Sequence, residues 1–175
     1  HRHLWEHVWT PPTTTPTPVL AVWFRGAAKS TITRRVAIGL GATRRRSFAL
    51  WVSGTQDAAD RHVTSATTNL SPELLRVYPW LTQRSETALK VTQGLRQSMV
   101  SVGNRFTLLG VGLNTRTRGV TIGEQRPDLI VFDDLDERTD SPRVTQKKFR
   151  VLTEEVLPTA QHAGALVVGA QNLIH

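Results

Sequence analysis

The stretch Leu129-Ile130-Val131-Phe132-Asp133-Asp134 places four apolar residues directly before two acids. A continuous apolar run of this kind is typical of a strand in a parallel sheet that is covered on both faces. Ligands of such sheets bind at the carboxyl ends of the strands. We therefore expect Asp133 to reach a bound Mg²⁺ and Asp134 to orient or deprotonate an attacking water molecule. The alternative is a solvated acidic turn after a strand.

A second strand end of interest lies much earlier in the chain, where the apolar run 19–24 precedes a helical pattern that starts at Lys29. A strand, a small-residue loop and a helix are the context of a phosphate loop, because backbone N–H groups at the helix N-terminus point at the phosphates. Lys29 would contact the β- and γ-phosphates and Ser30 would bind Mg²⁺. The Walker A pattern has Gly where Trp23 and Ala28 stand, so a turn with a solvated Lys is the alternative.

The two segments together favour nucleotide hydrolysis, since they occur in the order Walker A then Walker B and each follows a strand. Apolar runs that alternate with helical patterns predict an α/β fold with a mainly parallel sheet and helices on both faces. Strands are expected at 19–24, 47–53, 128–132 and 165–170, and helices at 1–9, 29–40, 56–69 and 143–157. A hairpin is expected from 97–102 and 105–111, and 71–85 is expected to be irregular because of Pro72 and Pro79.

Several segments resemble the ATPase domain of the large terminase subunit of tailed phages. They are Phe-Arg-Gly-Ala-Ala-Lys-Ser-Thr at 24–31, Ser-Gly-Thr-Gln-Asp-Ala-Ala at 53–59, and Arg-Gly at 118–119 followed by Arg-Pro-Asp-Leu-Ile-Val-Phe-Asp-Asp-Leu at 126–135. Terminases often carry a variant phosphate loop of the Arg-Gly-x-x-Lys-Ser-Thr type, which accounts for the missing glycines. The resemblance spans most of the chain and implies a P-loop NTPase fold of the RecA/ASCE type.

The resemblance also implies ATP and Mg²⁺ as ligands and assigns roles to residues. Arg25 would sense or stabilise the γ-phosphate, and Asp134 would act on the water. Ser30 and Asp133 would hold Mg²⁺. The nucleotide would be bound by Arg25, Gly26, Ala27, Ala28, Lys29, Ser30 and Thr31.

Two further roles follow from the resemblance alone. Arg118 resembles the Arg that some terminases supply to a neighbouring subunit, with Arg105 and Arg116 as competitors and a contact to the DNA backbone as the alternative. Gln171 or Asn172 would couple loss of the γ-phosphate to movement.

The implied function is ATP hydrolysis that drives viral duplex DNA into a procapsid. The implied partners are duplex DNA, the portal protein, the small terminase subunit and further copies in a ring, at the procapsid portal in the cytoplasm of the infected bacterium. Residues 1–18 would form a helix and a Thr/Pro linker, and 19–175 the ATPase domain. The family's nuclease domain would follow, so we expect no DNA cleavage by this chain. The alternatives are another P-loop DNA motor or helicase, or a DNA- or capsid-binding module with a degenerate phosphate loop.

The composition is compatible with these expectations. The net charge of +8 favours contact with a polyanion such as nucleic acid. The absence of Cys excludes disulfides, thiolate metal sites and a Cys nucleophile. No apolar run has the length of a membrane span, so no membrane partner is expected. His1, His3 and His7 are expected to belong to a polar terminal segment rather than to a metal site.

Overall fold

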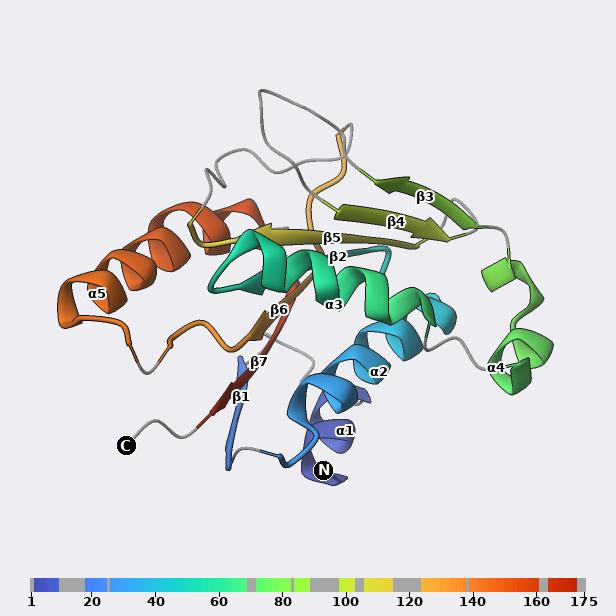
Figure 1. Cartoon of the computed structure of the whole chain (residues 1–175). Coiled ribbons are helices and arrows are strands. Elements are labelled where there is room, and N and C mark those ends of the chain that lie inside the picture. The colour runs from blue at the N-terminus through green and yellow to red at the C-terminus, as the bar shows by residue number, and fades with distance from the viewer. Residues whose placement is uncertain are drawn as a thin grey trace.

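One sheet of seven strands, in the order β1-β7-β6-β2-β5-β4-β3, organises the described part of the chain (Figure 1). The computed structural model describes residues 2–9, 18–24, 26–68, 72–82, 84–88, 98–102, 106–114, 124–137, 139–160 and 164–172. In sheet order, the parallel strands are β1 (Val19–Trp23), β7 (Leu166–Asn172), β6 (Leu129–Asp133), β2 (Phe48–Ser53) and β5 (Phe106–Gly112). The antiparallel strands β4 (Ser98–Val102) and β3 (Arg84–Ala88) extend the sheet beyond β5.

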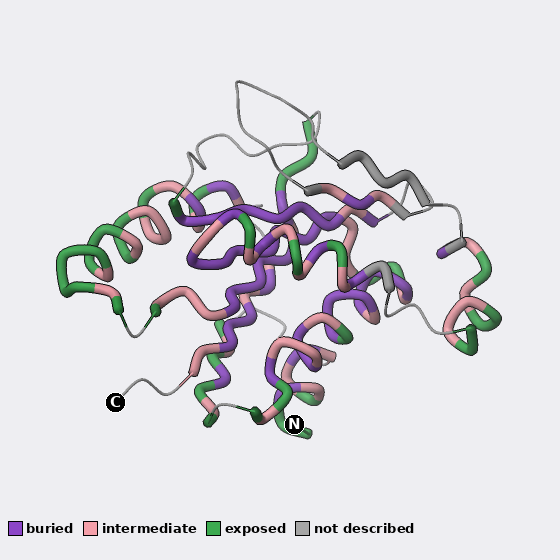
Figure 2. Tube along the Cα trace, viewed as in Figure 1, coloured by how far each residue is buried: buried purple, intermediate pink, exposed green. Residues whose placement is uncertain are grey.

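Helices cover both faces of the central strands, whose residues are almost all buried (Figure 2). On one face, α1 (Arg2–Trp9), α2 (Lys29–Ala42) and α3 (Gln56–Thr68) pack against a core that includes Trp51 and Val131. The other face is covered by α5 (Pro142–Val151), the π-helical turn Leu152–Val156 and the 3₁₀ turn Leu157–Thr159.

Successive residues of each central strand point to opposite faces, as the pleat of a strand requires. Trp51 and Val131 therefore face α2 and α3, while Leu50 and Ile130 belong to the core beneath the π-helical turn. This double burial explains why the strand sequences are continuously apolar instead of alternating. The prediction of an α/β fold with a mainly parallel sheet is confirmed.

The largest error in the predicted elements concerns residues 71–85, because the described part of this range, 72–82 and 84–85, is not irregular. Pro72 opens helix α4 (Pro72–Val77) and Pro79 opens a 3₁₀ turn (Pro79–Thr82). Pro is suited to the first helical position because the N–H groups of the first turn have no acceptor within the helix. Strand β3 follows at Arg84–Ala88. The hairpin of β4 and β5 is confirmed, but its expected Gly103-Asn104 turn lies outside the described residues.

Two predicted helix ends are also wrong. Helix α2 continues past Gly41, where a Cβ atom would lie 2.4 Å from the Phe106 ring, so this Gly serves packing rather than termination. The predicted helix 143–157 starts at Pro142, where the Ser141 hydroxyl accepts a bond from Val144 N, and changes to π-helical geometry at Leu152. Within the described residues, no helix has both the length and the apolar character to cross a membrane.

Candidate functional site

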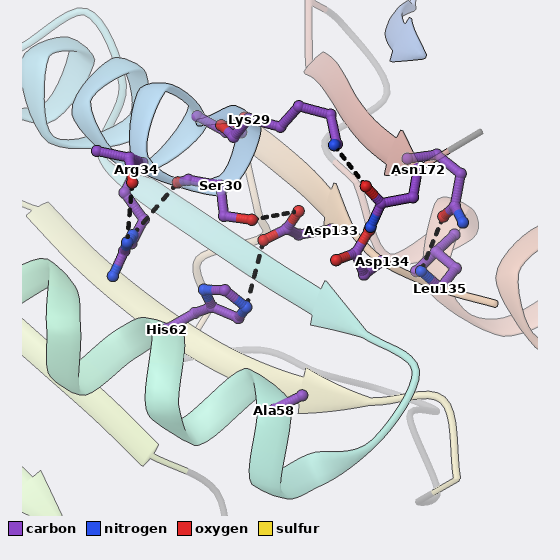
Figure 3. A network of polar contacts seen from close by, with 12 residues as sticks. Lys29, Ser30, Arg34, Ala58, His62, Asp133, Asp134, Leu135 and Asn172 are labelled. Atoms are coloured by element: carbon purple, nitrogen blue, oxygen red, sulfur yellow. Dashed lines mark hydrogen bonds and ion pairs between the residues drawn. The ribbon is translucent and has the colours of Figure 1, made fainter. Parts of the chain in front are cut away.

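The parallel register brings the predicted site residues to one edge of the sheet. Trp23 lies beside Asn172 across β1 and β7, and Asp133 lies beside both Ala170 and Ser53. Helix α2 starts at the same edge. Side chains from the start of α2 and the ends of β6 and β7 meet there in a network of polar contacts (Figure 3).

Lys29 is the first residue of α2, and its side chain is turned into the protein with only 5% of the residue exposed. Its Nζ atom donates to Asn172 Oδ1 at 2.6 Å and to Phe24 O at 3.0 Å. The N-terminus of a helix carries partial positive charge, so a buried ammonium group there is unfavourable without such acceptors. An anion bound at this place would be a stronger partner for Lys29 than either neutral oxygen.

The loop before Lys29 has the backbone of a tight turn. Gly26 has φ +88° and Ala28 has φ +55°, so both lie in the left-handed region. Gly adopts this region freely, whereas Ala does so at a cost of roughly 1–2 kcal/mol. Ala28 stands where the Walker A pattern has its last Gly, and its backbone has a conformation that favours Gly. Arg25, predicted to contact the γ-phosphate, lies outside the described residues.

Asp133 ends β6 as a fully buried acid with an incomplete set of partners. The Ser30 hydroxyl donates to its Oδ1 at 3.0 Å. The two side chains predicted to bind Mg²⁺ therefore lie next to each other, as a shared metal ion would require. Its Oδ2 makes no hydrogen bond, although His62 Nε2 lies 3.2 Å away off the direction of a hydrogen bond. Burial, with a smaller contribution from Asp134, raises the pKa of Asp133 to about 7.

His62, on α3, was missed by the sequence analysis. Its ring stacks on the buried Trp51 with centroids 5.1 Å apart and planes inclined by 25°. Burial is the main cause that lowers the pKa of His62 to about 4, helped by Arg34 and Arg61, so the imidazole is neutral at pH 7. The contact with Asp133 joins residues that are distant in sequence, so only their proximity in the folded structure reveals it.

Arg34, one turn into α2, was also not predicted as part of the site. Its Nε atom donates to the Ser30 backbone carbonyl at 3.2 Å (Figure 3). The spacing of four residues after Ser30 was the available signal, since residues at this spacing lie on one face of a helix. Its guanidinium group is one of the charges that favour the ionised form of Asp133.

Asn172 connects the two predicted motifs. Its Nδ2 donates to Asp134 Oδ1 at 2.7 Å while its Oδ1 accepts from Lys29, so one amide bridges the lysine and the second acid. Its neighbour Gln171 accepts a bond from Leu135 N at 3.0 Å. Both residues predicted to couple the site to movement therefore contact either the site or the segment that follows it.

Buried polar atoms without hydrogen bonds concentrate at this edge. Within the described residues there are four such side-chain atoms, namely Trp51 Nε1, Ser53 Oγ, Asp133 Oδ2 and Gln171 Nε2. The last three lie at or near the carboxyl ends of β2, β6 and β7. Buried polar groups without a partner are rare and costly, so their clustering indicates a site that a ligand completes.

The donor set fits Mg²⁺, which prefers hydroxyl and carboxylate oxygens. Asp133 keeps an oxygen without a hydrogen bond, and the Ser30 hydroxyl lies beside the other oxygen. The described residues contain no group of three or more His, Asp or Glu side chains placed to hold a metal ion. A Mg²⁺ site here would therefore depend on oxygens of the substrate, as is usual for nucleotide-bound Mg²⁺.

The basic turn after α2 is engaged within the chain. Arg44 lies over the Trp80 ring at 5.7 Å and Arg45 over the Trp9 ring at 5.5 Å, while Arg46 donates to Gly164 O at 2.6 Å. Arg118, which was predicted to act in trans, and its competitors Arg105 and Arg116 lie outside the described residues.

Comparison with known proteins gives little further information. No family model matches the sequence, and no curated protein matches it. One similar solved structure is described as "The Phi-28 gp11 DNA packaging Motor". It is 14% identical with a TM-score of 0.47, and the alignment covers 98% of this chain and 48% of that chain. The chain thus spans about half the length of that neighbour.

Proposed function

We propose that this chain binds ATP with Mg²⁺ at the carboxyl edge of the sheet and hydrolyses it, as the ATPase of a DNA-packaging motor of the large terminase type. The proposal includes a P-loop NTPase fold. The observation that carries it is the contact between the two motifs: Ser30, directly after Lys29 at the start of α2, donates to Asp133 at the end of β6. Chemistry on a triphosphate needs a cation, a metal-binding hydroxyl and a metal-binding carboxylate together in this way.

Each residue then has a defined task. Lys29 exchanges its neutral acceptors for phosphate oxygens, and the first N–H groups of α2 bind the same anion. Ser30 and Asp133 hold Mg²⁺, which when bound neutralises charge on the phosphate oxygens. Asp134 orients the attacking water and accepts its proton. The water oxygen bonds to the γ-phosphorus while the bond to the β,γ-bridging oxygen breaks, giving ADP and phosphate.

The proposed site also needs an arginine, because charge spreads over the transferring phosphoryl oxygens and a bidentate cation stabilises it. Arg25 is proposed to act within the chain. Arg118 is proposed to act on the next copy in a ring, with Arg105 and Arg116 as competitors. A ring at the portal of a procapsid, with the small terminase subunit as a further partner, belongs to the same proposal.

Helix α5 supports the proposed contact with duplex DNA. Arg143, Lys147 and Arg150 are exposed at helical spacing on one side of α5, and the helix contains no acid. Such a row suits the phosphate backbone. Lys148 of the same helix donates to Leu135 O at 2.9 Å, and Leu135 N is bound to Gln171. The basic helix is therefore tied to the segment that leaves the site.

A second candidate function is a non-hydrolysing DNA- or capsid-binding module with a degenerate phosphate loop. The observation in its favour is the phosphate loop, which has Ala28 at a left-handed backbone position and no Gly there. A helicase or another P-loop DNA motor would share the site and differ in its other domains.

The test is ATP hydrolysis by the purified chain with and without Mg²⁺ and duplex DNA, over a range of protein concentrations that allows neighbours to form. Lys29→Ala is the test variant and Arg76→Ala, exposed on α4, is the matched control. Mg²⁺-dependent turnover that Lys29→Ala abolishes and Arg76→Ala retains would support the proposal. Nucleotide binding that needs Lys29 without turnover would indicate an intact site that lacks the arginine of its neighbour. The absence of nucleotide binding would refute the ATPase proposal and favour the binding module.

A further inference from the structure

We infer that His62 is a positioning residue for the Mg²⁺ ligand Asp133: its imidazole, fixed by Trp51, holds the carboxylate in the orientation in which Oδ1 meets Ser30. The inference rests on the proposed function, and it adds a third element, helix α3, to a site otherwise built from α2, β6 and β7.

Asp133 is held from two sides by residues of different helices. Ser30 of α2 donates to Oδ1 at 3.0 Å, and His62 Nε2 of α3 lies 3.2 Å from Oδ2. A carboxylate has one soft torsion between its plane and the backbone, so contacts at both oxygens restrict rotation about that bond. The two contacts, one from each helix, therefore determine the plane of the carboxylate (Figure 3).

His62 is itself well fixed. Its ring stacks on Trp51, which is fully buried on β2. Ala59, one turn earlier on α3, and Val63, the next residue, are fully buried as well. The His62 side chain retains 22% exposure. A ring held by stacking and by a packed helix loses little further freedom when it supports Asp133, which is what positioning of a metal ligand requires.

A purely structural role explains this contact poorly. A buried polar side chain elsewhere in the sheet region has its hydrogen bonds completed: the Gln56 side chain donates to Gly110 O at 3.0 Å and accepts from Gly112 N at 2.9 Å. Between His62 and Asp133, one carboxylate oxygen is left buried without a hydrogen bond. An arrangement that lowers stability in this way is expected where function requires it.

The chemistry follows from the ring atoms. His62 Nε2 lies 3.2 Å from Asp133 Oδ2 without a hydrogen bond, and a small rotation of either group would let a neutral imidazole with its proton on Nε2 donate to that oxygen and oppose rotation of the carboxylate. Support of this kind for a metal-binding carboxylate affects metal affinity by about 10- to 100-fold. We therefore expect His62 to act on the Mg²⁺ dependence of the site rather than on the affinity for nucleotide alone.

The experiment compares the parent chain with His62→Phe, His62→Gln and a control, His3→Phe on α1. Phe keeps a ring to stack on Trp51 but has no donor, whereas Gln keeps a donor and loses the ring. Binding of a fluorescent ATP analogue is titrated with Mg²⁺, and thermal unfolding and ATP hydrolysis are measured beside it. We expect His62→Phe to raise the Mg²⁺ concentration for half-maximal effect at least about 10-fold, with Gln closer to the parent.

In the absence of Mg²⁺, all four proteins should bind the analogue alike. A His62→Phe protein that folds and shows a Mg²⁺ dependence within a factor of about two of the parent would refute the inference. If the parent binds no nucleotide with Mg²⁺, the proposed function itself is wrong, so the two failures are distinguishable. If His62→Phe does not fold, a further variant, His62→Ala, which has neither ring nor donor, decides: a folded His62→Ala protein whose Mg²⁺ dependence stays within a factor of about two of the parent would assign His62 to the core.

Discussion

Two aspartates at opposite ends of strand β6 have contrasting surroundings. Asp128 precedes the strand, and its carboxylate accepts bonds from Ser47 N at 2.7 Å, Ser47 Oγ at 2.8 Å and Phe48 N at 2.9 Å. Asp133 ends the strand and accepts a hydrogen bond only from Ser30 among the described residues, with its other oxygen unsatisfied. The chain has completed the contacts of one acid and left those of the other open.

The difference separates a structural acid from the acid that is proposed to function in the site. Asp128 ties the start of β2 to the start of β6, so its bonds contribute to the register of the sheet. Asp133 sits where polar atoms without partners gather. The Asp in the run Arg-Pro-Asp-Leu at 126–129 therefore contributes to assembly of the sheet at the edge opposite the candidate site.

Substitution of the open acid is expected to have the largest effect. Asp133→Asn should reduce Mg²⁺-dependent ATP hydrolysis by roughly 100-fold or more, because a carboxylate ligand of the metal is lost. At pH 8 its stability to urea should equal or exceed that of the parent, since an ionised buried carboxylate is removed. Full activity in this variant would contradict the functional role of Asp133.

Substitution of the completed acid should show the opposite pattern. Asp128→Asn loses charge-assisted bonds to Ser47 and Phe48, so we expect the free energy of unfolding to fall by about 1–3 kcal/mol. Nucleotide binding by the folded protein should be unchanged, because Asp128 lies at the other edge of the sheet. Loss of nucleotide binding at full stability would break the contrast between the two acids.

The pH dependence of stability sharpens the comparison further. Folding raises the pKa of Asp133 from 3.8 to about 7 and lowers that of His62 from 6.5 to about 4. Between about pH 4 and pH 6.5, the folded protein holds one proton on Asp133 and none on His62, whereas the unfolded chain holds one proton on His62 and none on Asp133. The proton count is the same in both states, so the two opposite contributions cancel in the parent.

A substitution of either residue alone should reveal the pH dependence of stability that the other residue contributes. Relative to the parent, His62→Phe should lose stability as the pH rises from 4 to 7, because its folded state binds more protons than its unfolded state. Asp133→Asn should gain stability from pH 4 to 6.5 for the reverse reason. Either slope can reach about 1.4 kcal/mol per pH unit. Urea unfolding across this range measures both, and two flat differences would refute the burial of these groups.

The smallest effect is expected at the amino edge, which is the edge of the sheet where the parallel strands begin. Arg45 donates to Trp9 O at 2.8 Å and lies over the Trp9 ring, so Arg45→Ala should lower the free energy of unfolding by about 0.5–1 kcal/mol. ATP hydrolysis by the folded protein should be unchanged. A strong loss of hydrolysis would show that the amino edge also takes part in function. Thermal unfolding beside the hydrolysis assay is sufficient.

The sequence predicted the parts of the fold that one local pattern determines. β2 and β6 were recognisable because both of their faces are buried, so their sequences are continuously apolar. β3 was not, because Arg-Ser-Glu-Thr-Ala has no apolar run and its pairing with β4 is a tertiary effect. Pro72 was misjudged because Pro that breaks a helix also suits its first turn.

The candidate site divides in the same way. The sequence predicted the residues that lie at the ends of local elements. Asp133 ends a strand and Asp134 follows it, while Lys29 and Ser30 open a helix. The bridge through Asn172 and the contact of His62 with Asp133 depend on which strands are neighbours, and β7 lies between β1 and β6 only in the folded sheet.

The position of Lys29 has an energetic consequence for any anion that binds there. Its ammonium group already has two short bonds, to Asn172 and Phe24 O, so binding is an exchange of acceptors and not the creation of new ones. The affinity then reflects the difference between phosphate and these oxygens. The exchange also frees Asn172, whose other end is bound to Asp134. An anion bound to Lys29 would thus act on Asp134, which directly follows the neighbouring strand β6, through the released amide of Asn172.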